Sequence, residues 1–252
     1  ASKLGEVIRR FEGDEVFSAV EDLRKKCKAR RRGDDDAVDL ESLLAEVDGL
    51  ELPVAARVAR AFTLFFFLLN TAEQVHRVRR RRSYRDAEAS QPASFRWTFE
   101  RLKEAGMTGD EVQDHLRQLD VRPVLTAHPT EATRRTVLAL QARVSTALLG
   151  REDASPGERR RLESEVEADI ELLWLTADRL RQRPSVKHEV SNAVWYLQPR
   201  LLEAEARLHD SLQQSFDSVF GAQGLLRSPV RFGSWVGGDR AGDPSVTPDR
   251  AV

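Results

Sequence analysis

One histidine stands where a short apolar segment ends and a basic segment begins. His128 follows an apolar run from Val121 to Leu125 in the string VRPVLTAHPTEATRRT, which covers residues 121–136. β-Branched and aliphatic residues favour a strand, and a proline interrupts strand pairing because it has no N–H to donate. Since Pro129 comes directly after the histidine, we predict a buried strand that delivers His128 to a surface.

Two arginines follow in the same segment. Thr130 can cap a helix that we expect over about 131–148, which places Arg134 and Arg135 near its N-terminus. Free N–H groups at a helix N-terminus and guanidinium groups both attract anions, and a neutral imidazole can act as a base near pH 7. The segment therefore predicts an anion-handling site. A hydrogen-bonded structural role for His128 is the alternative that these residues alone leave open.

A glycine-rich segment near the C-terminus is a second candidate site. Residues 229–249 read PVRFGSWVGGDRAGDPSVTPD, and the alternation within 230–236 predicts another strand. The glycines after it would let the backbone approach a ligand closely, and an adjacent acid and arginine would form an oriented charged pair. A structural glycine turn is the alternative. The candidate residues are Gly237, Gly238, Asp239, Arg240 and Gly242.

Long amphipathic helices are expected to position these two segments. Apolar residues recur at helical spacing from Leu4 onward, and the charged run KARRRGDDD at 28–36 should be a solvated loop. A central helix is predicted from Pro53 to about Arg82, because proline suits a first helical position. The residues expected to face the core from this helix are Val58, Phe62, Phe65, Phe66 and Leu69.

Further helices are predicted on both sides of the first strand. Ser94 should cap a helix that ends near Leu102, and Thr108 with Glu111 matches a capping box at the start of the next one. Beyond the first strand, long helices are expected over roughly 158–181 and 187–215, with a break at Pro184.

Charge and composition argue against several classes of protein. The 252 residues contain 40 Lys+Arg and 41 Asp+Glu, and the net charge of −1 gives no general attraction to nucleic acid or to membranes. Six arginines lie between Arg77 and Arg85; we interpret them as cations at a helix C-terminus, and nucleic-acid binding is the alternative. The longest strongly apolar run, residues 64–69, is far shorter than the ~20 residues a bilayer requires.

The single cysteine indicates a reducing compartment. Cys27 cannot form an internal disulfide, so we expect a cytoplasmic protein. The charge balance and the short apolar run lead us to expect a soluble protein with no nucleic-acid or membrane partner. The absence of an initiating methionine and the abrupt end suggest a fragment. We predict a helical region over 1–120 and a second region over 121–252.

Both candidate segments resemble signatures of one enzyme family. LTAHPTEATRRT resembles the first signature of phosphoenolpyruvate carboxylases, in which the histidine is catalytic. WVGGDRAGDP resembles their second signature, a tryptophan followed by Gly-Gly-Asp-Arg-Asp-Gly-Asn-Pro, from which Ala241 and Asp243 depart. AFTLFFFLLNTAEQVHRVRR and WLTADRLRQRPSVKHEVSNAVWYL are similar to other family segments, although Ala177 stands where the family usually has an acid. The resemblance thus covers nearly the whole chain.

The resemblance implies a fold and a reaction. The fold would be mainly α, with long helices around the first strands of an elaborated α/β (TIM-like) barrel that is truncated here. The reaction would be the Mg²⁺-dependent joining of phosphoenolpyruvate and bicarbonate to oxaloacetate and phosphate. His128 would transfer a proton and hold the carboxyphosphate intermediate. Arg134, Arg135, Asp239 and Arg240 would bind substrate.

Some parts of such an enzyme are expected outside this sequence. The resemblance implies that the carboxylate ligands of Mg²⁺ and an arginine-rich glycine loop lie downstream of Val252; this chain has no metal-binding spacing of its own. It also implies a homotetramer for the complete enzyme, and we expect the fragment alone to be inactive. A helical scaffold module that retains the motifs without catalysis is the alternative function.

Overall fold

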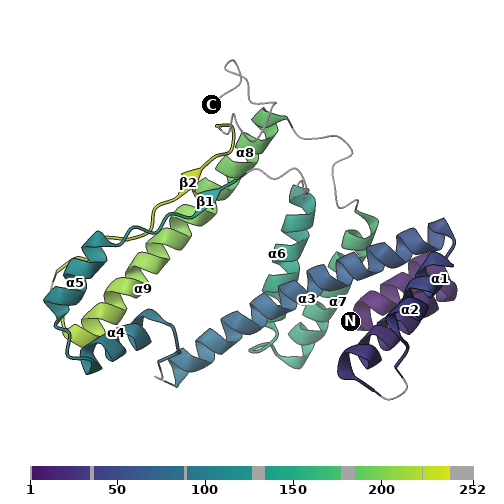
Figure 1. Cartoon of the computed structure of the whole chain (residues 1–252), viewed down its shortest axis with the longest axis horizontal. Helices are drawn as coiled ribbons and strands as arrows, with labels where there is room; N and C mark the ends of the chain where they lie inside the picture. Colours follow the sequence, from purple (N-terminus) through teal and green to yellow (C-terminus); the bar gives the residue numbers. More distant parts are fainter. Residues whose placement is uncertain are drawn as a thin grey trace. The chain divides into compact units, whose positions relative to one another are not determined.

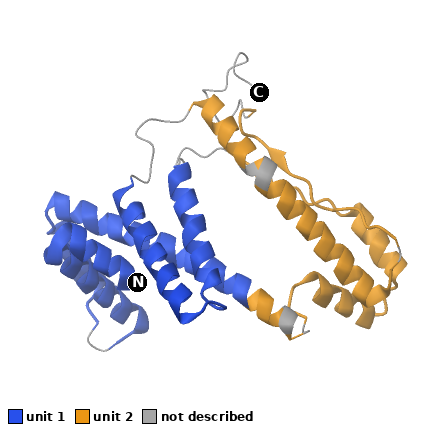
Figure 2. Cartoon of the chain, turned by 180° about the vertical axis from the view of Figure 1, so that it is seen from behind, with its two compact units in different colours: residues 1–79, 133–178 blue, residues 80–132, 179–252 orange. Residues whose placement is uncertain are grey.

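The computed structural model is mainly helical, with one short pair of strands (Figure 1). The mainly helical class is therefore confirmed. Two compact units divide the chain: unit 1 contains residues 1–79 and 133–178, and unit 2 contains residues 80–132 and 179–252 (Figure 2). This division differs from the predicted one at residue 121, which stays a prediction. The structure describes residues 2–34, 37–87, 90–126, 134–176, 185–222 and 224–238.

Unit 1 is built from helices. They are α1 (Ser2–Arg32), α2 (Leu40–Asp48), most of α3 (Leu52–Asp86), α6 (Arg135–Gly150) and α7 (Pro156–Leu175). α1 bends at Gly13, whose φ of 83° suits glycine. The prediction of a loop from residue 28 was wrong, because α1 continues to Arg32. Arg30, Arg31 and Arg32 occupy its last turn, where cations are favourable.

The core of unit 1 is mostly aliphatic. Buried residues recur at helical spacing on one face of each helix, so that each apolar stripe meets a neighbouring stripe. Burial of one such side chain stabilises the fold by about 1.5–3 kcal/mol. The buried cluster comprises Leu4, Val7, Ile8, Val16, Val20, Leu23, Leu43, Val58, Ala61, Leu64, Val137, Leu140, Ile170, Leu173 and Trp174.

The core-facing side of α3 was predicted only in part. Val58 is buried, and Phe62 and Phe65 are half-buried, but Phe66 and Leu69 are exposed. The reason is geometric: the buried positions Ala61, Leu64, Thr71 and Val75 define one face, and a rotation of about 100° per residue leaves Phe66 on the opposite one.

α3 also contains a long apolar stretch. By length and composition, its stretch Leu52–Tyr84 could cross a membrane, with a mean hydropathy of 1.7 over its most apolar 18 residues and 17% of that window buried. Core helices of soluble proteins meet the same criterion, and α3 contributes Val58, Ala61 and Leu64 to the core of unit 1. The expectation of no membrane partner stays a prediction.

Unit 2 combines helices with the strand pair. Its elements are α4 (Phe95–Glu104), α5 (Gly109–Gln118), β1 (Val124–Leu125), α8 (Val186–Tyr196), a π-helical segment (Leu197–Leu201), α9 (Leu202–Phe220) and β2 (Gly233–Ser234). Its core is partly aromatic: the rings of Phe99 and Phe216 meet edge to face with centroids 5.6 Å apart. Phe99, Val112, Leu212, Phe216 and Leu226 form the buried cluster.

The predicted helix caps at Ser94 and Thr108 are confirmed. The Ser94 side chain accepts from the N–H of Trp97, and Thr108 and Glu111 form a reciprocal capping box. Hydrogen bonds to Thr108 lower the pKa of Glu111. α7 begins with a further capping box, between Ser155 and Glu158. Each cap satisfies N–H groups that the first helical turn leaves without partners.

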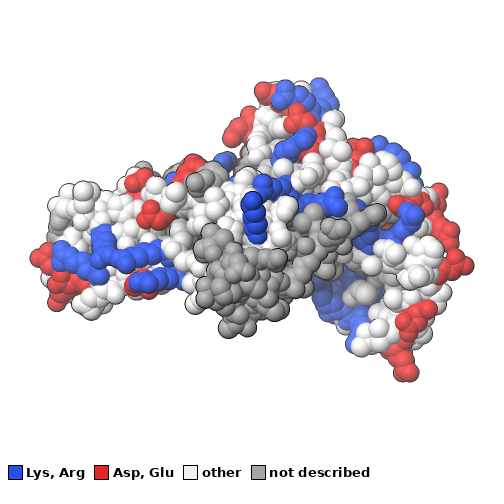
Figure 3. Space-filling view, turned by 90° about the horizontal axis from the view of Figure 1, so that it is seen from above, with Lys and Arg blue, Asp and Glu red and all other residues white. Residues whose placement is uncertain are grey.

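Two long predicted helices differ from those observed. α7 ends at Leu175, followed by Thr176 in an extended conformation, whereas a helix to residue 181 was expected. The second helix is divided by the π-helical segment around Pro199, which has no N–H to donate to a regular helix. Charges of both signs are interspersed on the face shown in Figure 3, in keeping with the near-zero net charge.

Candidate functional site

β1 and β2 lie side by side in parallel. Val124 pairs with Gly233 and Leu125 with Ser234, and an isolated bridge joins Val121 to Val230. The N–H groups of Gly233 and Trp235 donate to the oxygens of Pro123 and Leu125 at 3.0 and 2.8 Å. This ladder confirms both predicted strands, each shorter than expected, and fixes their register.

Parallel pairing brings the starts of the two candidate motifs together. Parallel strands end at the same edge, so the residues after Leu125 and those after Ser234 leave the pair at that edge. In the sequence, His128 comes three residues after Leu125, and Asp239 comes five residues after Ser234. The two segments predicted to carry chemistry therefore begin at one place in the fold.

A turn follows β2 directly. The N–H of Gly238 donates to the oxygen of Trp235 at 2.9 Å, and Gly237 has a φ of 77°. A side chain at Gly237 would strain this conformation, whereas Gly238 has no positive φ and its added Cβ would make only ordinary contact. Gly233 matters for packing instead, because a Cβ there would lie 3.4 Å from Cγ2 of Val124.

The strand pair is more exposed than predicted. Val121, Val124 and Trp235 expose 44%, 45% and 57% of their surfaces, so the expectation of a buried strand was wrong for the described residues. The backbone ladder accounts for the pairing, but the apolar side chains of a parallel pair normally need cover on both faces. Within the described residues these three side chains lack that cover.

The predicted site residues fall into two groups. His128, Asp239, Arg240 and Gly242 lie outside the described residues. Gly237 and Gly238 form the turn after β2, in unit 2. Arg134 and Arg135 lie in unit 1. The structure therefore leaves the grouping of these residues into one site as a prediction.

The expected start of the helix after the first motif was wrong. α6 begins at Arg135, and Arg134 is its N-cap, with φ −65° and ψ 139° and no capping bond from its side chain. A helix from about residue 131 was expected because Thr130 is a good cap. The extended backbone of Arg134 places the start of α6 at the next residue, Arg135. Arg135 is consequently the first helical residue, where a cation does not benefit from the helix dipole.

A polar cluster at the end of α7 was not anticipated. Arg60 donates to the oxygens of Trp174 and, at 2.7 Å, of Thr176, and its guanidinium lies 5.4 Å from the centroid of the Trp174 ring. The indole N–H of Trp174 donates to Glu12 at 3.0 Å, and Arg57 pairs with the same carboxylate. A cation at a helix C-terminus satisfies free carbonyls. The sequence feature that could have indicated this cluster is Arg60, an arginine within the apolar stretch of α3.

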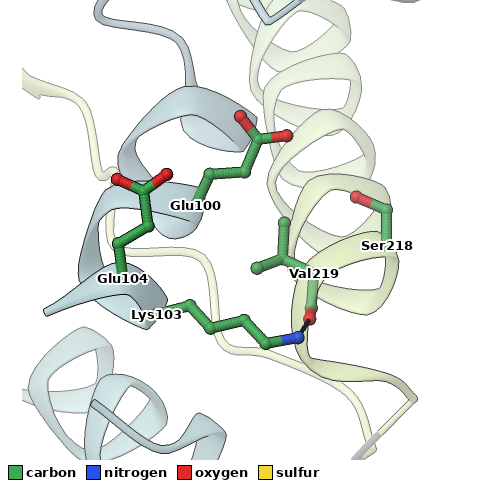
Figure 4. Close-up of a pocket in the computed structure, with 5 residues that line it drawn as sticks. All are labelled: Glu100, Lys103, Glu104, Ser218 and Val219. Atoms are coloured by element: carbon green, nitrogen blue, oxygen red, sulfur yellow. Dashed lines mark hydrogen bonds between the residues drawn. The ribbon is translucent and has the colours of Figure 1, made fainter. Parts of the chain in front are cut away.

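One surface hollow of about 380 Å³ lies between α4 and α9, away from the candidate motifs (Figure 4). The Nζ of Lys103 donates to the oxygen of Val219 at 2.5 Å across it. Glu100 pairs with Arg96, and Glu104 with Arg101. Both carboxylates that line the hollow are thus already paired with arginines of α4. Its residues are therefore explained by contacts within unit 2.

The described residues offer no metal centre of their own. Among them, no group of three or more His, Cys, Asp or Glu side chains is placed to hold a metal ion. Asp120, just before the strand pair, is instead bound to Arg122 at 2.6 Å, and this bond lowers the pKa of Asp120. This ion pair lies ahead of β1, at the end of the strand opposite the two motifs.

The fold and the motifs define a class of protein. It is a mainly helical chain in which a parallel strand pair ends in two polar segments, the arrangement that α/β enzymes use to assemble a site. The family model for phosphoenolpyruvate carboxylase matches residues 1–251, and the chain belongs to that family.

Relatives with this name cover nearly all of the chain. The phosphoenolpyruvate carboxylase of Thermus thermophilus is 41% identical over 249 residues, which are 98% of this chain and 28% of the relative. That of a Thermus species, strain 71, is 38% identical with the same coverage. That of Xanthomonas campestris is 34% identical over 96% of this chain and 27% of its own length. The chain thus spans little more than a quarter of these relatives.

Proposed function

We propose that the chain forms the N-terminal part of a phosphoenolpyruvate carboxylase, which joins phosphoenolpyruvate and bicarbonate to give oxaloacetate and phosphate. The observation that carries the proposal is the register of the strand pair, because it starts both signature segments from one edge. Family membership supports the same reaction, since the relatives are named for it.

The proposed reaction assigns a role to each candidate residue. Bicarbonate attacks the phosphoryl group of phosphoenolpyruvate, which leaves carboxyphosphate and the enolate of pyruvate. Carboxyphosphate releases CO₂ and phosphate, and the enolate carbon bonds to CO₂ to form oxaloacetate. His128 accepts the proton of bicarbonate and then holds carboxyphosphate by hydrogen bonding. Arg134, Arg135 and Arg240 stabilise the phosphoryl and enolate oxygens as charge develops, and Asp239 orients Arg240.

Mg²⁺ would reinforce this stabilisation by polarising the phosphoryl oxygens. The described residues provide no cluster of ligands for it. As the family resemblance implies, we assign its ligands to the part of the family's polypeptide that lies beyond the match. The proposal extends to the barrel: β1 and β2 would be its first two strands, and further strands would cover Val121, Val124 and Trp235. A cytoplasmic location and a homotetrameric complete enzyme are also part of it.

The test uses two proteins. One is the chain of residues 1–252. The other, the completed enzyme, is the Thermus thermophilus relative with its matched 249 residues replaced by this chain. We expect oxaloacetate from the completed enzyme and none from the chain alone. His128→Asn in the completed enzyme should lower kcat by about 10²–10⁴-fold if the histidine acts in proton transfer.

Thermal unfolding provides the control. If His128→Asn lowers stability and activity together, the histidine has a structural role and its catalytic assignment fails. If the completed enzyme folds, as judged by circular dichroism, yet forms no oxaloacetate, the chain is a non-catalytic module and the proposed function is wrong. Oxaloacetate formation by residues 1–252 alone would contradict the assignment of essential parts to the rest of the family's polypeptide.

A further inference from the structure

α3 carries an exposed aromatic surface in unit 1. Phe66 exposes 56% of its surface and Leu69 exposes 50%. The ring of Phe66 contacts two half-buried neighbours, with centroids 6.5 Å from Phe62 and 5.5 Å from Phe65. We call these four side chains the α3 patch; Phe66 and Leu69 are its exposed members, and Phe62 and Phe65 also pack against the core of unit 1. An exposed aromatic ring gathered with other partly exposed apolar side chains is typical of interaction surfaces, whereas a single exposed leucine would need no explanation.

Polar residues border the α3 patch along the helix. Thr63 and Asn70 are exposed beside it, and Glu73 pairs with Arg77 at 2.7 Å one turn further on. An apolar centre with a polar rim is the usual anatomy of a protein interface. Positions 62–69 span about 11 Å of helix axis at 1.5 Å per residue. A bilayer requires about 30 Å of apolar length, so this surface fits a protein partner better than a membrane.

The opposite face of α3 is held firmly in unit 1. Ala61 and Leu64 belong to the buried core, and Arg57 and Arg60 are bound to Glu12 and to the end of α7. Exposing that face would cost the burial of its side chains, about 1.5–3 kcal/mol for each large one. α3 can therefore offer the α3 patch to a partner while its other face stays packed.

We propose that the α3 patch is a docking surface for the polypeptide that family members carry beyond the matched region, through an apolar segment that packs on Phe66 and Leu69. The match covers about 28% of the length of these relatives. Most of their polypeptide therefore lies outside the match and is available as the partner. Aromatic anchors of this kind carry most of the binding energy in protein interfaces. The inference rests on family membership and not on carboxylation.

Two cysteines report on the surface directly. Phe66→Cys places a thiol in the α3 patch, and the native Cys27, exposed on α1, is the internal control. Labelling with a maleimide is followed peptide by peptide by mass spectrometry. In residues 1–252 alone, both thiols should react readily. In the completed enzyme the thiol at position 66 should react at least about tenfold more slowly, because access requires local opening, while Cys27 should keep its rate.

Three labelling outcomes would overturn the proposal. Equal reactivity of position 66 in the two proteins would mean that no added polypeptide covers it. Slow labelling in the isolated chain, independent of concentration, would mean that the chain covers the surface itself. Protection of the isolated chain that grows with its concentration, or on addition of phosphatidylcholine vesicles, would assign the surface to a second copy or to a lipid surface instead. These readouts need no enzymatic activity, so failure of the proposed function is distinguishable.

A second measurement does not depend on the completed enzyme. Phe66→Ser combined with Leu69→Ser in residues 1–252 should leave Tm within a few degrees, because exposed sites contribute little to stability. The same variant should bind less of an apolar fluorescent dye. Leu64→Ser is the matched control on the buried face, and it should lower Tm by a larger amount. A fall in Tm as large as that of Leu64→Ser would overturn the proposal.

Discussion

The helical cores and the strand pair are built in different ways. Phe99, Leu212 and Phe216 in unit 2 are almost wholly buried against residues of the same unit. Val124 and Trp235 belong to that unit as well, yet about half of each side chain is exposed. The helical cores thus find their apolar partners within the described chain, whereas the exposed members of the α3 patch do not. The strand pair has a fixed register but incomplete cover, and this difference indicates where the chain is self-sufficient.

Removing a side chain from the aromatic core should give the largest effect. Phe216 is fully buried and lies edge to face with Phe99. Phe216→Ala should lower the free energy of unfolding by about 3–5 kcal/mol, because it leaves a cavity that helices α4 and α9 cannot fill. Urea unfolding followed by circular dichroism measures the loss. Leu225→Ala, at an 89% exposed position, is the control and should change little. Similar losses in the two variants would contradict a self-sufficient core.

A buried carboxylate in unit 1 should give a smaller effect that depends on pH. Burial raises the pKa of Asp169 above its ordinary 3.8, although Arg143 lies 2.7 Å away and opposes the shift; Glu165 adds to it. The folded state therefore binds the proton more tightly than the unfolded state. The stability that this proton contributes is present below pH 3.8 and is lost as pH rises through the raised pKa.

Asp169→Asn removes this dependence. Relative to the native chain, the variant should become more stable as pH rises from about 4 to 7, since the buried charge no longer has to form. Urea unfolding at several pH values measures the trend, and Asp217→Asn, in unit 2, can serve as a carboxylate control. A variant that becomes relatively less stable as pH rises would show that the ion pair with Arg143 outweighs the cost of burial.

The exposed strand pair should give the smallest effect on stability. Trp235→Ala should change the free energy of unfolding of residues 1–252 by no more than about 0.5 kcal/mol, because the side chain is exposed and its backbone bond to Leu125 remains. In the completed enzyme the same change should cost more, if added strands cover it. Thermal unfolding of the two pairs of proteins makes the comparison. If Trp235→Ala lowers stability by the same small amount in residues 1–252 and in the completed enzyme, further strands do not cover this side chain.

The sequence predicted features that local chemistry determines. The capping box of Thr108 and Glu111 and the N-cap at Ser94 were found because two or three neighbouring residues specify them. Both strands were recognised from short apolar runs, and the mainly helical class from apolar spacing. Their parallel pairing needed the structure, because the strands are more than 100 residues apart and periodicity carries no information about a partner.

Other features depend on packing that the sequence does not display. Phe66 was assigned to the core from apolar residues at helical spacing, but the direction of the buried face is set by how α3 meets its neighbours. α6 begins after Arg134 and not at the good cap Thr130, because a cap permits a helix start without requiring it. The role of Arg60 at the end of α7 joins residues more than 110 positions apart. His128 and Arg240 were nominated from motifs, and their assignment stays a prediction.

The most direct test of the account is a double-mutant cycle in the completed enzyme. If the two signature segments form one site because β1 and β2 pair, His128→Asn and Arg240→Gln act on the same step. We predict that their effects on kcat/KM are non-additive, with a coupling of about 0.5–3 kcal/mol, and that the double variant loses less than the product of the single losses. Losses that multiply independently would contradict the claim that these segments act as a single site.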